Sequence, residues 1–333
     1  MAEALSGRDV SVSFAGSPDR GEGDLVTSAG YAFDAFQVGG IPRELSARAA
    51  RAIVAGVRAP AAVGRIIDRR EADVVLGAGG YVGGPAVLAA ALRRIPAALT
   101  EADAHLGLAN RLAAPFAKRV FLAYPIAGRK GAKYHVTGRP IPTRSRPPAG
   151  GRAEARTRFG LPLEGPVVLV CGGSLGARRL NEAAVDAWAE TGPAVLHLAG
   201  ERDEPSLSGR VRRDDYRLLG LTADFGAALA AADLVVSRAG GVVWEIAAAG
   251  RPALLVPYPY ATADHQTQNA RWFASGGGAV LVPEARLDLA RQADELLRDS
   301  ARLERMSAAM QRLSRPNAAE TVAAGLIELA AGG

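Results

Sequence analysis

Cysteine is nearly absent from this chain of 333 residues, in which Cys171 is the single cysteine. One thiol cannot form an internal disulfide, so the fold cannot depend on a disulfide framework, and this fits a reducing compartment. Cys171 ends an apolar run at residues 167–170, so we expect a small buried hydrophobe there and no nucleophile. No apolar run is long enough to cross a bilayer, and no signal peptide is recognisable.

Lysine is also scarce, with only Lys118, Lys130 and Lys133 among 40 basic residues and a net charge of +6. The excess arginine favours partners that carry phosphate, because a guanidinium pairs with phosphate in bidentate fashion. Aromatic residues make up 5% of the chain and are not interleaved with lysine-rich runs, which argues against nucleic acid as a partner. No cluster of carboxylates is visible, so we expect no metal site, and we expect no cofactor.

The length suits two ordinary domains, and 49% hydrophobic with 22% charged residues is typical of a globular protein. Apolar strand, glycine turn and helix follow one another in both halves, which predicts two α/β units. A stretch rich in glycine, proline and arginine separates them and is typical of a linker. We therefore expect an N-terminal domain at 1–140, a linker at 141–165, a C-terminal domain at 166–315, and a final helix at 316–333 that packs back toward the first domain.

One stretch, residues 234–270, carries the clearest pattern of a binding site. An apolar run ends in a turn at Gly240 and Gly241, a helix with Glu245 follows, and a second apolar run leads to a loop with His265 and Gln266. Free N–H groups at such a turn suit a phosphate, and Glu245 could accept from two vicinal sugar hydroxyls. The alternative is a solvated helix carboxylate beside glycines that only shape the turn.

The N-terminal half has its own glycine-rich turn after an apolar strand at residues 74–76. Glycines occupy positions 77, 79, 80, 83 and 84, and Pro85 is expected to open the next helix. A strand at residues 97–99 follows, with Glu101 and Asp103 just beyond its carboxyl end, where ligands of parallel sheets bind. The pattern imitates a dinucleotide fingerprint, but its G-x-G-G-x-x-G-G spacing argues against a nicotinamide cofactor.

Residues 44–70 form a basic, apolar helical region that Pro60 is expected to interrupt. Helical spacing sends the apolar residues to one face and the arginines to its rim. The region is therefore either a core-facing helix with a solvated face or a patch that settles on anionic lipid head groups. The candidate membrane patch is Arg51, Val54, Val57, Arg58 and Arg65. Further strands are expected at 10–14, 33–38, 167–170, 194–198 and 216–219, and helices at 24–30 and 225–232.

Five segments in order cover nearly the whole chain: GAGGYVGGP at 77–85, TEAD and GLANR within 100–111, GGSLGA at 172–177, SRAGG with a following glutamate at 237–245, and DHQTQNA at 264–270. In these segments the chain resembles the MurG family of glycosyltransferases, which add N-acetylglucosamine to the lipid-linked muramyl-pentapeptide precursor of peptidoglycan. The resemblance implies an α/β protein of GT-B architecture, with two Rossmann-like domains facing each other across a cleft. It also implies an inverting hexosyltransferase.

Partners and location follow from the same resemblance. The C-terminal half would bind UDP-N-acetylglucosamine, and the N-terminal half would bind the undecaprenyl-linked muramyl-pentapeptide. The protein would be peripheral at the cytoplasmic face of the cell membrane, on an anionic surface, with other wall-synthesis proteins as possible partners. Its roles would be cell-wall biogenesis, cell shape and cell division.

The resemblance also assigns site residues. Glu245 would bind the donor ribose, Thr222 would lie beside the uracil, and Glu101 is the tentative catalytic acid-base group. The donor-binding set is Asp103, Ser174, Thr222, Arg238, Gly240, Gly241, Val242, Val243, Glu245, His265 and Gln266. The positions facing the acceptor or its phosphates are Gly79, Gly80, Tyr81 and Asn110.

The chain departs from the family pattern at several positions. The family opens with a strand and a GGTGGH-like loop whose histidine is the favoured general base, and this sequence starts after that loop. Thr100 and Ala102 replace a histidine and a glutamine, Leu175 replaces a glutamine, and Pro142 replaces an arginine. Donor recognition is thus better supported than catalysis. Two alternatives stay open: a UDP-sugar-binding partner in a wall-synthesis complex without catalysis, or another GT-B enzyme such as a nucleotide-sugar epimerase.

Overall fold

A computed structural model describes the chain except for residues 19–20, 38–46, 174–176 and 333, and the side chains of residues 47–57 are not described either. The chain divides into two compact units. Unit 1 comprises Met1–Pro140 together with Asn317–Gly333, and unit 2 comprises Ile141–Pro316. The C-terminal helix therefore belongs to unit 1, and the stretch expected as a linker belongs to unit 2.

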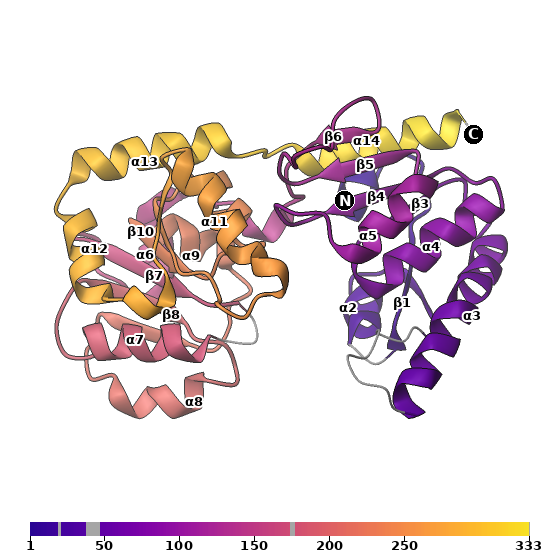
Figure 1. Ribbon diagram of the computed structural model, residues 1–333. Coiled ribbons are helices and arrows are strands. Elements are labelled where there is room, and N and C mark those ends of the chain that lie inside the picture. The colour runs from indigo at the N-terminus through magenta and orange to yellow at the C-terminus, as the bar shows by residue number, and fades with distance from the viewer. Residues whose placement is uncertain (19–20, 38–46, 174–176, 333) are drawn as a thin grey trace. The chain divides into compact units, whose positions relative to one another are not determined.

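Unit 1 contains a four-stranded parallel sheet in the order β3-β4-β5-β6 and a separate parallel pair, β1-β2 (Figure 1). Its strands are β1 (Ser13–Gly16), β2 (Ala32–Ala35), β3 (Val75–Gly77), β4 (Ala97–Glu101), β5 (Arg119–Leu122) and β6 (Tyr134–Val136). Its helices are α1 (Ala2–Leu5), α2 (Glu22–Ser28), α3 (Ala47–Arg70), α4 (Gly80–Leu92), α5 (Leu108–Ala113), the 3-10 turn η2 (Ala114–Phe116) and α14 (Ala318–Ala331).

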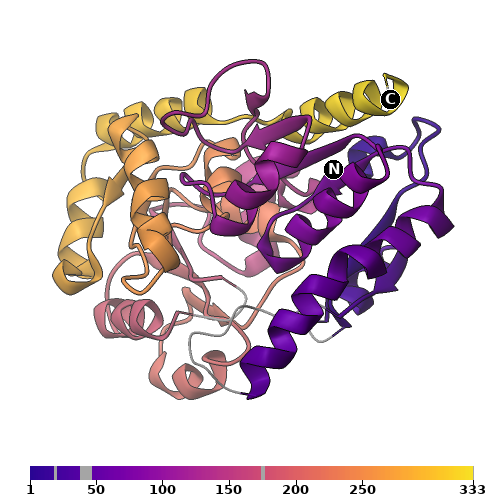
Figure 2. The same cartoon turned by 45° about the vertical axis from the view of Figure 1, so that its right-hand side comes forward.

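Small and branched apolar side chains close the core of unit 1. Ala59, Val63 and Ile67 recur every four residues along α3 and are buried, so this face packs on α4, which Figures 1 and 2 show beside it. Val322 and Leu326 of α14 form a second cluster with strand residues of the sheet. An ion pair of 2.7 Å between Arg119 and Glu328 lies at the edge of that contact.

Unit 2 is a six-stranded parallel sheet in the order β12-β11-β10-β7-β8-β9 (Figure 1). Its strands are β7 (Val167–Cys171), β8 (Ala194–Leu198), β9 (Tyr216–Leu219), β10 (Leu234–Ser237), β11 (Ala253–Leu255) and β12 (Ala279–Leu281). Its helices are α6 (Gly151–Phe159), α7 (Arg178–Trp188), α8 (Glu204–Leu207), α9 (Phe225–Ala231), α10 (Val243–Ala248), α11 (His265–Ser275), α12 (Leu289–Leu297) and α13 (Ser300–Leu313), with 3-10 turns η3 (Thr143–Ser145), η4 (Ser208–Arg210), η5 (Thr262–Asp264) and η6 (Glu284–Arg286).

The order of strands fixes where a ligand of unit 2 belongs. Counted along the chain, the strands of this sheet follow the doubly wound order 3-2-1-4-5-6, with the direction of winding reversing between β7 and β10. Both strands are buried along their whole length, as the continuous apolar runs predicted. Ligands of such sheets bind outside the carboxyl ends of the strands at this switch point.

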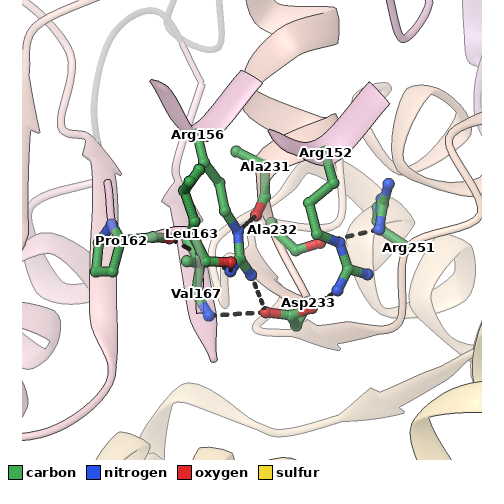
Figure 3. A network of polar contacts seen from close by, with 9 residues as sticks. All are labelled: Arg152, Arg156, Pro162, Leu163, Val167, Ala231, Ala232, Asp233 and Arg251. Carbon is green, nitrogen blue, oxygen red and sulfur yellow. Dashed lines mark hydrogen bonds and ion pairs between the residues drawn. The ribbon is translucent and has the colours of Figure 1, made fainter. Parts of the chain in front are cut away.

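At the opposite ends of these strands, a polar network fastens α6 to the sheet (Figure 3). Arg156 is 2% exposed and donates to the carbonyls of Ala231 at 3.1 Å and Leu163 at 2.7 Å, and it pairs with Asp233 at 2.7 Å. Asp233 also accepts from the backbone N–H of Val167 at 2.8 Å. Residues 141–165, expected as a linker, thus include a helix that is anchored in unit 2.

Several expected boundaries differ from the structure. Helix α4 begins at Gly80 and contains Pro85, because Gly79 adopts φ 86° and ψ −166°, a conformation almost reserved for glycine, and turns the chain earlier. Helix α3 continues through Pro60. Strand β4 extends to Glu101, so this residue ends the strand instead of following it. Strands β1 and β2 lie at 13–16 and 32–35, and among the described residues they pair with each other alone.

No helix in the described part of the chain is long and apolar enough to span a membrane.

Candidate functional site

Two turns follow β7 and β10 at the switch point of unit 2. After β7 the chain passes Gly172, where an added Cβ would lie 2.3 Å from the Cβ of Ala177, so packing itself demands glycine. Ser174 lies outside the described residues. Cys171 is buried, and burial raises the pKa of its thiol to about 12, so the thiol stays neutral and packs as a small hydrophobe.

The turn after β10 is open on one side. Gly240 does not have a positive φ, and an added Cβ would meet no atom of the described chain within 4 Å. The N–H groups of Val243, Trp244 and Glu245 donate to the carbonyls of Gly240, Gly241 and Val242 at 3.0 to 3.3 Å. Within the described residues, the N–H groups of Gly240, Gly241 and Val242 donate to no backbone carbonyl. This turn therefore presents N–H groups beside free space, which suits an anion.

Glu245 lies on α10 directly after this turn and is half-buried. Its Oε1 accepts a hydrogen bond of 2.9 Å from the hydroxyl of Ser145 in η3. No local sequence pattern indicates this contact, because the two residues lie 100 positions apart. A purely solvated helix carboxylate, the alternative expected above, does not describe this geometry.

The start of α11 carries His265 and Gln266, the predicted donor-binding residues that were expected in a loop. Gln266 Oε1 accepts from the backbone N–H of Tyr258 at 2.9 Å. His265 Nδ1 lies 2.8 Å from the carbonyl oxygen of Thr262; since a carbonyl only accepts, Nδ1 carries the hydrogen. Ala263 and Asp264 adopt left-handed φ values of 53° and 52°, a conformation that costs a non-glycine residue about 1 kcal/mol or more and often occurs at functional sites.

Arg238 is buried, and unit 2 itself uses its guanidinium. Nη1 donates to the carbonyls of Val256 at 3.1 Å and Pro257 at 3.3 Å, and Nη2 pairs with Glu284 of η6. The guanidinium carbon also lies 5.6 Å from the ring centre of Tyr258. With these contacts Arg238 supports the loop that follows β11. Its role in donor binding stays a prediction.

Thr222 lies half-exposed in the loop between β9 and α9. Its hydroxyl accepts a hydrogen bond of 3.1 Å from the N–H of Asp224. This bond stabilises the loop directly before α9.

A buried polar chain supports the end of β8, and sequence reasoning missed it. Asn181 Nδ2 donates to Ala199 O at 2.8 Å and to Asp203 at 3.0 Å, so its Oδ1 must accept, here from His197 Nε2 at 3.1 Å. His197 Nδ1 is then the acceptor for the hydroxyl of Tyr216 at 2.8 Å. His197 has no exposed surface, and burial lowers its pKa to about 4. The imidazole is therefore neutral at pH 7.

In unit 1 the structure brings Glu101 and Asn110 together. Glu101 is 8% exposed and accepts from the N–H groups of Asp103 at 3.2 Å and Gly107 at 2.9 Å and from Asn110 Nδ2 at 2.9 Å. Asn110 Nδ2 also donates to Thr100 O at 2.9 Å. Both carboxylate oxygens of Glu101 accept hydrogen bonds from the chain, so the residue orders the loop at 102–107. Its role in catalysis stays a prediction.

The glycine turn of unit 1 lies next to this pair. A Cβ on Gly79 would be 3.7 Å from Asn110 Nδ2, so the turn and α5 are neighbours. Gly80 has φ 63° and open space beside it, and Tyr81 is 48% exposed. Asp103 is half-exposed in the loop that Glu101 orders. Gly79, Gly80 and Tyr81 thus form one surface at the start of α4, and the buried Asn110 lies next to Gly79.

The predicted membrane patch is only partly within the described side chains. Arg58 and Arg65 are exposed on α3, whereas the side chains of Arg51, Val54 and Val57 lie outside the described residues. A different apolar row was missed: Leu108, Leu112 and Phe116 recur every four residues on α5 and η2 and are 54%, 63% and 51% exposed. Their four-residue spacing was the signal that could have revealed the row.

Among the described residues, no group of three or more histidine, cysteine, aspartate or glutamate side chains could hold a metal ion.

Comparison with known proteins places this geometry in a family. The N-terminal domain model of glycosyltransferase family 28 matches residues 1–122, and the C-terminal domain model matches residues 167–322. A relative from Rubrobacter xylanophilus, named UDP-N-acetylglucosamine–N-acetylmuramyl-(pentapeptide) pyrophosphoryl-undecaprenol N-acetylglucosamine transferase, is 39% identical over 97% of this chain and 96% of its own.

Solved structures agree with that relationship. The crystal structure of Acinetobacter baumannii MurG has a TM-score of 0.77 and 27% identity, and the match covers 98% of this chain and 93% of that one. A UDP-N-acetylglucosamine 2-epimerase from Neisseria meningitidis has a TM-score of 0.61 at 12% identity, with 95% and 91% coverage. At that identity the epimerase shows the fold alone.

Proposed function

This chain belongs to the MurG family of glycosyltransferases, and we propose that it transfers N-acetylglucosamine from UDP-N-acetylglucosamine to lipid-linked muramyl-pentapeptide. The observation that carries the proposal is the 39% identity to a named transferase over 97% of the chain. The epimerase alternative has support only at the level of fold. Participation in wall biogenesis, and through it in cell shape and division, is part of the same proposal.

The donor site belongs at the switch point of unit 2. We place the diphosphate at the open turn of Gly240–Val242 and the ribose at Glu245, one helical turn on. Among the described residues, the N–H groups of this turn donate to no backbone carbonyl, and a Cβ added to Gly240 would meet no atom within 4 Å. The loop of Thr222 would flank the uracil, and His265 and Gln266 would face the sugar. Ser174, on the neighbouring turn after β7, stays a candidate donor contact.

The reaction is a single inverting displacement. The C4 hydroxyl of the acceptor attacks the anomeric carbon, its proton passes to a base, and the bond to UDP breaks with the electron pair leaving on the diphosphate. N–H groups of the turn after β10 would stabilise the charge that develops on the leaving group. In unit 1 the surface of Gly79, Gly80 and Tyr81, with Asn110 next to it, would face the acceptor, while Glu101 keeps its loop in place.

Gly240→Ala tests the donor site directly. The backbone φ of Gly240 is not positive, and no described atom lies within 4 Å of an added Cβ. A methyl group should therefore leave the fold intact while occupying the volume assigned to the diphosphate. We expect UDP affinity, measured by calorimetry, to fall at least about tenfold. Gly209→Ala is the matched control, because Gly209 in unit 2 also has no positive φ and no described atom within 4 Å of an added Cβ.

Unchanged UDP affinity in Gly240→Ala would refute this placement of the site. A transfer assay with a lipid acceptor analogue and labelled UDP-N-acetylglucosamine then tests the reaction itself. UDP binding without product would favour the binding-partner alternative over the transferase.

We also propose that the protein is peripheral at the cytoplasmic face of the membrane and meets an anionic lipid surface through unit 1. The exposed row of Leu108, Leu112 and Phe116 offers apolar contact, and the exposed Arg111 and Lys118 beside it offer charge to anionic head groups. Arg58 and Arg65 on α3 add further exposed positive charge.

A further inference from the structure

Ser145 makes a side-chain hydrogen bond to Glu245, the candidate ribose ligand. Its Oγ lies 2.9 Å from Glu245 Oε1, and the serine is 4% exposed. An ionised carboxylate only accepts hydrogen bonds, so the serine hydroxyl donates. Hydrogen bonds to a charged group are stronger than neutral ones, so this contact restricts the rotation of the carboxylate.

The serine is fixed by the turn that carries it. In η3 the N–H of Ser145 donates to Pro142 O and the N–H of Arg146 donates to Thr143 O, both at 3.0 Å. The turn packs against Gly226 of α9, where only glycine fits, because an added Cβ would lie 2.1 Å from Arg146 O. Because the backbone of the turn lies directly on α9, Ser145 cannot readily move, and Glu245 must adapt to it.

The same turn also touches the other side of the candidate donor site. Helix α9 begins at Phe225, immediately after the loop in which Thr222 accepts from Asp224 N. The turn η3 therefore contacts both α9, the helix that follows the uracil loop, and, through Ser145, the carboxylate assigned to the ribose.

We propose that Ser145 is a positioning residue of the donor site, which holds the Glu245 carboxylate in the orientation that the ribose of a uridine nucleotide requires. This inference rests on the proposed donor site. A carboxylate has about four acceptor positions, so the bond from Ser145 is compatible with two further bonds from vicinal ribose hydroxyls. Loss of the serine hydroxyl lets the carboxylate rotate, which weakens the bonds to the ribose and leaves the diphosphate contacts unchanged.

The test compares UDP with 2′-deoxy-UDP, which lacks one ribose hydroxyl, by calorimetry on the full chain. We expect Ser145→Ala to weaken UDP binding by about three- to tenfold and 2′-deoxy-UDP binding by less, so that discrimination between the two falls. Glu245→Ala should weaken UDP binding further, and adding Ser145→Ala to it should change nothing more. Ser307→Ala is the control, because Ser307 donates to Gly250 O at 2.7 Å in the same unit without touching the donor site.

The outcomes separate the inference from the proposed function. If Glu245→Ala weakens UDP binding but Ser145→Ala binds both nucleotides within about twofold of the wild type, the site stands and the role of Ser145 is overturned. Additive losses in the double variant also overturn it, because Ser145 would then act independently of Glu245. If the wild type does not bind UDP, or Glu245→Ala leaves binding unchanged, both the site and the inference are overturned.

Discussion

The buried histidine of unit 2 makes its stability depend on pH in a way that can be measured. His197 is fully buried between Asn181 and Tyr216, and burial lowers its pKa from 6.5 to about 4. Each pKa unit corresponds to about 1.4 kcal/mol, so the difference between the folded and unfolded states amounts to roughly 3 kcal/mol.

The direction of the effect follows from which state binds the proton. Between pH 6.5 and about 4 the unfolded chain protonates His197 while the folded chain keeps it neutral, so the unfolded state binds more protons and stability rises with pH. The contribution is complete above pH 6.5. It is lost as the pH falls toward 4, and the loss levels off below that value.

Urea unfolding followed by tryptophan fluorescence isolates this unit, because the three tryptophans, Trp188, Trp244 and Trp272, all lie in unit 2. His197→Gln keeps a donor near Asn181 but leaves the Tyr216 hydroxyl unpaired, which should cost about 1–3 kcal/mol at pH 7. The advantage of the wild type over the variant should then fall by roughly 3 kcal/mol at pH 4, so that it vanishes or changes sign.

Tyr216→Phe is the control, because it removes the partner hydroxyl and keeps the titrating imidazole. Its unfolding free energy should follow the same pH dependence as the wild type. A difference between wild type and His197→Gln that stays constant from pH 7 to pH 4 would show that His197 does not titrate as its burial implies.

Two further predictions concern the membrane and the polar network at α6. Wild-type protein should sediment with anionic vesicles and be released at high salt. The double substitution Leu112→Ser and Phe116→Ser should reduce sedimentation, whereas the control Leu163→Ser, at an exposed position of unit 2, should not. Equal loss of sedimentation in both variants would show that unit 1 is not the docking surface. Asp233→Asn leaves the buried Arg156 without its charge partner and should lower the unfolding free energy of unit 2 by about 3 kcal/mol. The control Asp186→Asn, in an exposed ion pair, should lower it by less than about 1 kcal/mol. Equal losses in the two variants would contradict a stabilising role of the network.

The fold was predictable where burial imposes a simple pattern. Strand β8 occupies the residues expected from its apolar run, and β7 and β10 differ by one residue at the carboxyl end. All three are buried along their length, and a parallel strand buried on both faces needs continuous apolar residues. Strand β9 also lies at the expected residues, although it is an edge strand and only partly buried. The start of α4 was not predictable in this way. Gly79 and Gly80 both have positive φ, and the sequence indicates that glycine permits such values without showing that it adopts them.

The candidate site was predictable in residue type and sheet edge but not in partners. From the sequence, both Glu101 and Glu245 are expected beyond a strand and near a glycine turn, so the pattern does not distinguish their roles. In the structure Glu101 accepts from three donors of its own loop and helix, whereas Glu245 is oriented by a serine 100 residues away. Which carboxylate the chain itself uses depends on contacts between distant segments, and no local pattern encodes these.

The two glycine turns at the switch point of unit 2 differ in whether the chain's own packing explains the glycine, and this difference bears on where the ligand binds. At Gly172 an added Cβ would lie 2.3 Å from the Cβ of Ala177, so the protein's own packing accounts for glycine there. At Gly240 neither backbone conformation nor any described atom within 4 Å accounts for it. Gly172→Ala should therefore destabilise unit 2 in urea, while Gly240→Ala should unfold like the wild type yet bind UDP poorly. If Gly240→Ala were destabilised as much as Gly172→Ala, the space beside the β10 turn would serve the fold, and the diphosphate would have to lie elsewhere.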